Sequence, residues 1–141
     1  MMWQDVNHEY HKSVIELGGF VRDPGAMVWG HPCGGDPAVT LHSRLDDFVM
    51  EPGMNILFDC HGTLDLYCWD GGKTWVVDGD ATGDAKQYAN ATAAAATAVM
   101  EAMRPGVRIS ELQRVGRAVY RTSGVAGADD VLIFFHGLGL S

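Results

Sequence analysis

The spacing of apolar residues near the start of the chain predicts an amphipathic helix over residues 3–17. These residues stand three or four positions apart, on one face of a helix: Val6, Tyr10, Val14 and Leu17. The pair Gly18-Gly19 predicts the end of the helix, because glycine readily adopts the left-handed conformation that closes many helices. We therefore expect a helix that packs one apolar face against the rest of the fold.

The pattern after this helix predicts strands first and helices later. Turn residues dominate 20–47 around a short strand at 27–29, and three runs rich in β-branched and aromatic residues predict strands at 54–60, 63–69 and 74–77. An alanine-rich helix is predicted over 84–103, and a capping box of Ser110 and Gln113 predicts a second one over 110–122. A loop at 124–130 and a strand at 131–135 follow. This order predicts an α+β fold in which antiparallel strands pack with helices.

Two aspartates, Asp59 and Asp70, lie eleven positions apart in the region of the predicted hairpin. If the chain turns at Leu64-Asp65, the two aspartates face each other with Cβ atoms roughly 5 Å apart, where like charges destabilise a sheet. A divalent cation would relieve this repulsion, since such ions prefer hard oxygen ligands. His136 would add a nitrogen ligand, giving the mixed site of many metal-dependent hydrolases.

Two further residues next to Asp59 also belong to types that bind metals. Cys60 and His61 are expected to pack or to face solvent, because alternation along a strand turns neighbouring side chains to opposite faces. The three cysteines of the chain have no C-x-x-C spacing, so a structural zinc site is not expected.

Composition narrows the class of protein. A chain of 141 residues with 47% hydrophobic and 20% charged residues is typical of one soluble globular domain. A net charge of −8 argues against nucleic acid as a partner, because phosphate binding needs clustered lysine and arginine. No apolar run approaches the ~20 residues of a membrane span, and the N-terminus does not resemble a secretory signal. The odd number of cysteines suits a reducing compartment, so we expect a cytoplasmic protein.

Several sequence pieces around the two aspartates and His136 occur in a characteristic order. They are Leu57-Phe58-Asp59, Cys68-Trp69-Asp70-Gly71-Gly72-Lys73-Thr74-Trp75, Arg104-Pro105-Gly106-Val107 and His136-Gly137-Leu138-Gly139-Leu140. His42 stands seventeen positions before Asp59, and Pro52-Gly53-Met54 matches a turn that leads into the strand of Asp59. Together they resemble the pita-bread metallopeptidase family, which includes methionine aminopeptidase, prolidase, aminopeptidase P and the non-peptidase creatinase.

The resemblance implies an incomplete pita-bread fold and a metal-dependent hydrolase similar to Xaa-Pro peptidases such as prolidase or aminopeptidase P. In that family Asp59, Asp70 and His136 would bind metal, and His42 would act in catalysis by helping proton transfer. The implied cofactors are divalent ions (Mn, Co, Zn or Fe), two in the complete protein, which activate a water molecule. The implied partner is a small peptide or another small-molecule substrate, and a homodimer is left open.

The end of the sequence departs from the family pattern. In the family, two glutamates follow the His-Gly-x-Gly-Leu motif and complete the two-metal site, whereas no glutamate follows Glu111 here. We therefore expect residues 1–141 to form a partial catalytic domain that binds metal weakly and has little activity by itself.

Two further departures keep other functions open. Phe134-Phe135 is bulky where family peptidases carry a small residue, and Gly71-Gly72 replaces the usual pair after the second aspartate. One alternative is a non-peptidase member of the same fold, a creatinase-like hydrolase or a small-molecule lyase. The other is a degenerate, metal-free binding module, against which the joint presence of Asp59, Asp70 and His136 speaks.

Overall fold

The computed structural model describes residues 1–32, 40–42, 47–131, 133 and 136–139, with the backbone alone for residues 22–25. These residues form two compact units. The first unit comprises Met1–Asp80 and Gly137–Ser141, and the second comprises Ala81–His136.

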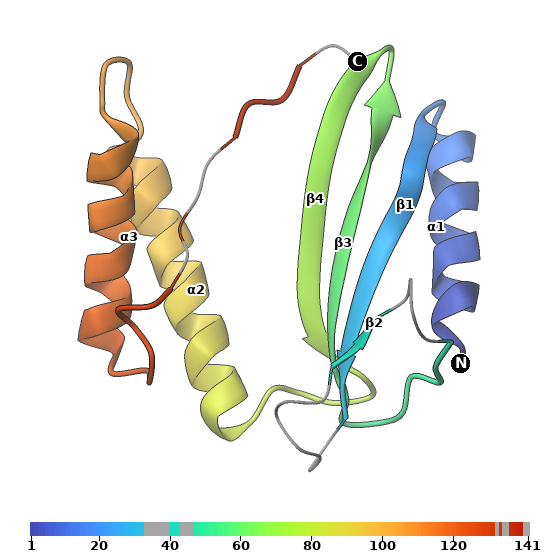
Figure 1. Ribbon diagram of the computed structural model, residues 1–141, viewed down its shortest axis with the longest axis horizontal. Helices are drawn as coiled ribbons and strands as arrows, with labels where there is room; N and C mark the ends of the chain where they lie inside the picture. Colours follow the sequence, from blue (N-terminus) through green and yellow to red (C-terminus); the bar gives the residue numbers. More distant parts are fainter. Residues whose placement is uncertain (33–39, 43–46, 132, 134–135, 140–141) are drawn as a thin grey trace. The chain divides into compact units, whose positions relative to one another are not determined.

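The first unit is built on a four-stranded antiparallel sheet (Figure 1). Its strands are β1 (Phe20–His31), β2 (Leu41–His42), β3 (Asn55–Leu64) and β4 (Tyr67–Val76), in the spatial order β2-β1-β3-β4. The short strand expected at 27–29 is part of the much longer β1. β1 extends this far because it pairs with β3, which is distant in the sequence. The three strands expected between residues 54 and 77 are two longer ones, β3 and β4.

The turn between β3 and β4 lies one residue later than the sequence pattern predicts. Leu64 pairs with Tyr67, and the two residues between them, Asp65 and Leu66, have positive φ angles of 49° and 67°. A two-residue turn with both φ angles positive matches the twist of the flanking strands, which makes it a favoured hairpin turn. The prediction of a turn at Leu64-Asp65 was therefore wrong by one position.

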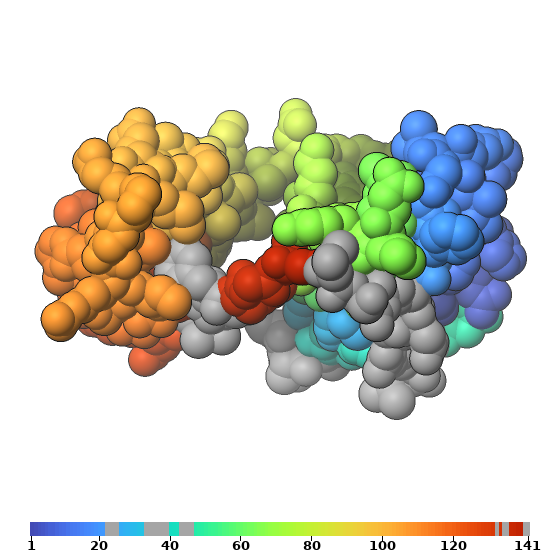
Figure 2. All heavy atoms as spheres, turned by 90° about the horizontal axis from the view of Figure 1, so that it is seen from above, coloured from blue at the N-terminus to red at the C-terminus, as the bar shows by residue number. Residues whose placement is uncertain are grey.

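Helix α1 (Trp3–Glu16) packs against one face of this sheet. Figure 2 shows its residues, in blue, beside the green residues of β3 and β4. Among the described residues, the main buried cluster of the unit contains Val28, Phe48, Met50, Met54 and Ile56. Of the expected helical stripe, Val14 is buried, whereas Leu17 is 82% exposed because the helix has ended and Gly18 turns the chain with φ +84°.

The second unit is a pair of helices, α2 (Gly83–Ala102) and α3 (Ile109–Ser123). Its buried core contains Ala91, Ala95, Tyr120 and Val125. The predicted capping box at Ser110 is wrong: the N-cap residue is Arg108, and Nε2 of Gln113 donates a hydrogen bond to the carbonyl of Ile133 at 2.8 Å instead.

The strand predicted over residues 131–135 falls partly outside the described residues, namely at 132, 134 and 135. Val131 and Ile133, which are described, lie in no strand and pack against the core of the second unit. Within the described parts of the chain, no helix is both long enough and apolar enough to cross a membrane. Antiparallel strands and helices confirm the predicted α+β class.

Candidate functional site

The register of the β3–β4 hairpin decides how the two aspartates lie. Asp59 pairs with Gly72, and Asp70 pairs with His61, so the predicted direct pairing of Asp59 with Asp70 is wrong. Moving the turn by one residue moves every cross-strand partner by two. Since residues two apart on a strand share a face, Asp59 and Asp70 still lie on the same face of the sheet, as a diagonal pair. Such diagonal neighbours have Cβ atoms about 7 Å apart, still within reach of one bridging cation.

His61 lies on the same sheet face as the two aspartates, which the sequence analysis did not anticipate. It stands two positions after Asp59, which puts it on the same face as Asp59, and it lies directly opposite Asp70. Side chains two positions apart on a strand share a face, and this rule could have placed His61 on the face of Asp59 from the sequence. Cys60 does lie on the other face, where its Sγ donates a hydrogen bond to the carbonyl of Gly71 at 3.2 Å.

The electrostatics of the hairpin show that both carboxylates act on one neighbouring group. The pKa of the Cys60 thiol is raised, first by burial and then by the negative charges of Asp59 and Asp70. Asp59 is half-buried, whereas Asp70 is exposed. Both carboxylates therefore contribute to the electrostatic environment of this thiol.

His42 lies on β2 rather than on the expected loop. It pairs with Trp29 of β1, and the two rings meet edge to face with their centroids 4.9 Å apart. Trp29 in turn pairs with Leu57, two positions before Asp59. His42 and Asp59 therefore share one face of the sheet, with β1 between them.

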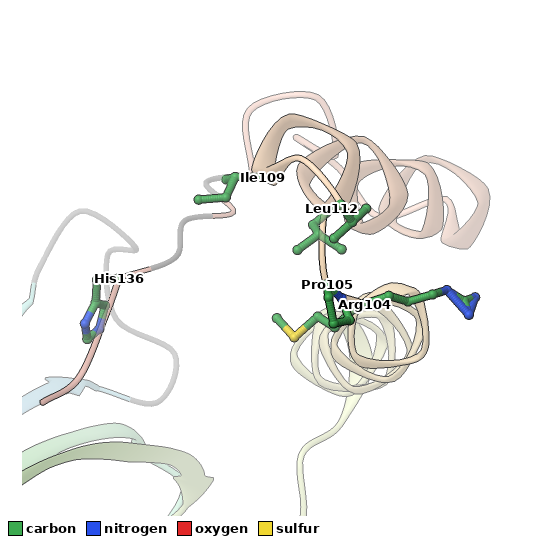
Figure 3. A pocket seen from close by; sticks show the side chains of 7 residues that line it. Arg104, Pro105, Ile109, Leu112 and His136 are labelled. Carbon is green, nitrogen blue, oxygen red and sulfur yellow. The ribbon is translucent and has the colours of Figure 1, made fainter.

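His136 belongs to the second unit, whereas Asp59 and Asp70 belong to the first. Its meeting with the two aspartates at one metal ion therefore stays a prediction. Within its own unit, His136 lines a largely apolar cavity of about 510 Å³ (Figure 3). The other lining residues come from the end of α2, the connection to α3 and the start of α3: Met103, Arg104, Pro105, Val107, Ile109 and Leu112. Figure 3 shows the Arg104 side chain extending away from His136.

The donors on the hairpin fit a divalent metal in their chemistry. Asp59 and Asp70 offer hard oxygen ligands on one face, and the Asp70 side chain is exposed. Among the residues that the structure describes, no three histidine, cysteine, aspartate or glutamate side chains are grouped so as to hold an ion. The hairpin alone therefore supplies a carboxylate pair, and a complete site needs donors from elsewhere.

Comparison with known proteins agrees with these features. The sequence profile of Metallopeptidase family M24 matches residues 2–141. The crystal structure of the dipeptidase PepE from Mycobacterium ulcerans is similar, with a TM-score of 0.72 and 25% sequence identity. The match covers 97% of this chain and 35% of the dipeptidase, so the chain spans about a third of that protein's length. Among curated proteins, no match was found. The profile match and the structural similarity confirm the predicted partial pita-bread fold, and the chain belongs to metallopeptidase family M24.

Proposed function

We propose that this chain is part of a metal-dependent peptidase that cleaves dipeptides, with a preference for those containing proline. The observation that carries the proposal is the placement of Asp59 and Asp70 on one face of the β3–β4 hairpin in a chain of family M24. The structurally similar protein is a dipeptidase, which supports a small peptide as substrate.

In this proposal the residues of the chain have separate roles. Asp59 and Asp70 would hold one or two divalent ions (Mn, Co, Zn or Fe), and His136 would add a nitrogen ligand. When bound, the metal would supply Lewis acidity and lower the pKa of a water molecule. His42, on the same sheet face as Asp59, would donate a hydrogen bond to the peptide group and help move a proton.

Metal binding by the 141-residue chain tests the carboxylate pair directly. Titration calorimetry with Mn²⁺ should detect weak binding that falls by more than about tenfold in Asp59→Asn and in Asp70→Asn, because each change removes an anionic ligand. Asp65→Asn is the matched control: it removes a carboxylate from the same hairpin at a turn position with φ 49°, a conformation that asparagine tolerates. Equal Mn²⁺ affinity in all three variants would refute the proposed site.

Peptidase activity tests the reaction. We propose that the chain as it stands turns over little, because two aspartates and one histidine hold metal less tightly than the family's full ligand set. Hydrolysis of a proline-containing dipeptide and of its alanine counterpart should be compared with Mn²⁺ present and after chelation. Cleavage that survives chelation would contradict a metal-dependent mechanism, and strong chelation-sensitive cleavage would contradict the expected weak activity.

A further inference from the structure

Tyr10 of α1 makes a hydrogen bond to the backbone of the candidate site. Its hydroxyl donates to the carbonyl of His61 at 2.9 Å. His61 is the direct cross-strand partner of Asp70 and lies two positions after Asp59. The bond therefore holds β3 at a residue that adjoins both aspartates.

The ring of Tyr10 contacts the chain neighbours of both aspartates. It meets Phe58 edge to face at a centroid distance of 5.6 Å, and Trp69 in the same way at 6.0 Å. Phe58 directly precedes Asp59 and Trp69 directly precedes Asp70, so alternation places these two rings on the face opposite the carboxylates. One side chain thus packs behind both aspartates at once.

Trp69 itself has little freedom in this arrangement. It pairs with Gly62, and a Cβ atom at Gly62 would lie 2.9 Å from Cζ2 of Trp69. The indole therefore lies close to the backbone of β3 at Gly62, where an added Cβ atom would crowd it. Tyr10 therefore contacts a ring that is itself packed against β3.

We propose that Tyr10 is a positioning residue for Asp59 and Asp70, acting from the opposite face of the sheet. Ligands of a metal ion must be held within about 0.5 Å of the productive geometry, which the diagonal placement of two carboxylates on neighbouring strands does not ensure by itself. The hydroxyl bond to His61 and the ring contacts with Phe58 and Trp69 fix the strand register and twist at this point. The inference rests on the proposed function, because it assigns the two carboxylates to a shared ion.

The test compares Tyr10→Phe with Tyr88→Phe in the 141-residue chain. Both changes remove a hydroxyl that donates to a backbone carbonyl, since Tyr88 donates to Ala126 in the second unit. Tyr10→Phe should weaken Mn²⁺ binding about tenfold, the lower end of the loss typical for residues that orient metal ligands. Tyr88→Phe should leave Mn²⁺ binding unchanged. A merely structural Tyr10 would lower the thermal midpoint without changing the Mn²⁺ affinity, and that result would overturn the proposal.

Amide hydrogen exchange without metal gives a second, independent measurement. In Tyr10→Phe, exchange at residues 59–62 and 69–72 should rise about fivefold relative to residues 55–57, the effect expected for loss of one hydrogen bond. A uniform rise along the whole hairpin would overturn the positioning role. If the unchanged chain binds no Mn²⁺, the proposed metal site on the hairpin fails, and the exchange pattern alone then decides whether Tyr10 orders the two aspartates.

Discussion

Among the described glycines of the first unit, Gly62 has the least room for a side chain. A Cβ atom there would lie 2.5 Å from the carbonyl oxygen of Phe20, which belongs to the backbone of β1 and has no flexible end to move. Gly62→Ala should therefore lower the free energy of unfolding by about 1–3 kcal/mol, as overpacking of a filled core does. Urea unfolding measures the change.

Gly71→Ala is the matched control for this substitution. Gly71 lies on β4 in the same hairpin, but a Cβ atom there would meet nothing within 4 Å. The free energy of unfolding should change by less than about 0.5 kcal/mol, as at most surface positions. Similar losses in both variants would show that strand glycines matter through backbone flexibility and not through the contact with Phe20.

Tyr10 should also make the fold sensitive to alkaline pH. Burial, with a smaller contribution from nearby Cys60, raises the pKa of Tyr10 from its usual 10.0 to about 12. Because the folded pKa exceeds the unfolded one, the stabilisation by neutral Tyr10 is fully present below pH 10 and is lost as pH rises towards 12. The free energy of unfolding of the unchanged chain should fall more steeply between pH 10 and 12 than that of Tyr10→Phe. Parallel pH profiles would contradict the burial of this hydroxyl.

At the scale of elements, the sequence predicts long helices well and the hairpin less precisely. The alanine-rich run predicts a helix over 84–103, and α2 covers Gly83–Ala102, because helix formation depends on local propensity summed over many residues. The hairpin turn has no Asn-Gly or Asp-Gly pair, so neighbouring turn positions differ little in local preference. The register of the hairpin is set by packing across the sheet. Hydrophobic alternation in the sequence specifies this register only to within two residues.

Leu66, in the turn of this hairpin, adopts an unfavourable backbone conformation. It is 66% exposed and has φ +67°, a conformation that costs a branched-chain residue about 1–2 kcal/mol and glycine nothing. Leu66→Gly should raise the free energy of unfolding by about 0.5–1 kcal/mol, since the gain in the turn exceeds the added entropy of the unfolded chain. Thermal or urea unfolding measures the gain.

Leu64→Gly provides the comparison for this prediction. Leu64 is also exposed, at 49%, but it lies in β3 and pairs with Tyr67. Glycine in a strand lowers stability by roughly 0.5–1 kcal/mol, so the two substitutions should act in opposite directions. A loss in both variants would place the turn elsewhere than at Asp65-Leu66.

For the whole molecule, the sequence identifies the candidate ligands better than their arrangement. The spacing of Asp59 and Asp70 in the sequence identifies them, and both lie on one face of the sheet. Side chains alternate between faces with a period of two, so an error of two residues in the predicted register leaves each side chain on the same face. The sequence analysis did not place His61 on the carboxylate face, and it did not link Tyr10 to the hairpin, since Tyr10 reaches the hairpin through tertiary packing of α1 on the sheet. His136 lies in the second unit, and its distance from the aspartates depends on contacts that local sequence does not encode.

The division into two units allows metal binding to be assigned to one of them. All four tryptophans, Trp3, Trp29, Trp69 and Trp75, lie in the first unit, so tryptophan fluorescence follows the unfolding of that unit alone.

An ion that binds only the folded hairpin stabilises it by mass action, by about 2.7 kcal/mol at a hundredfold excess over the dissociation constant. A hundredfold excess of Mn²⁺ should therefore raise the fluorescence midpoint of this unit by roughly 11–22 °C, and chelation should reverse the rise. Asp70→Asn should abolish the shift, whereas Asp65→Asn should keep it, because Asp65 lies in the turn and not on the carboxylate face. A shift of the same size in Asp70→Asn would mean that Mn²⁺ stabilises this protein of net charge −8 through general charge neutralisation and not through the carboxylate pair.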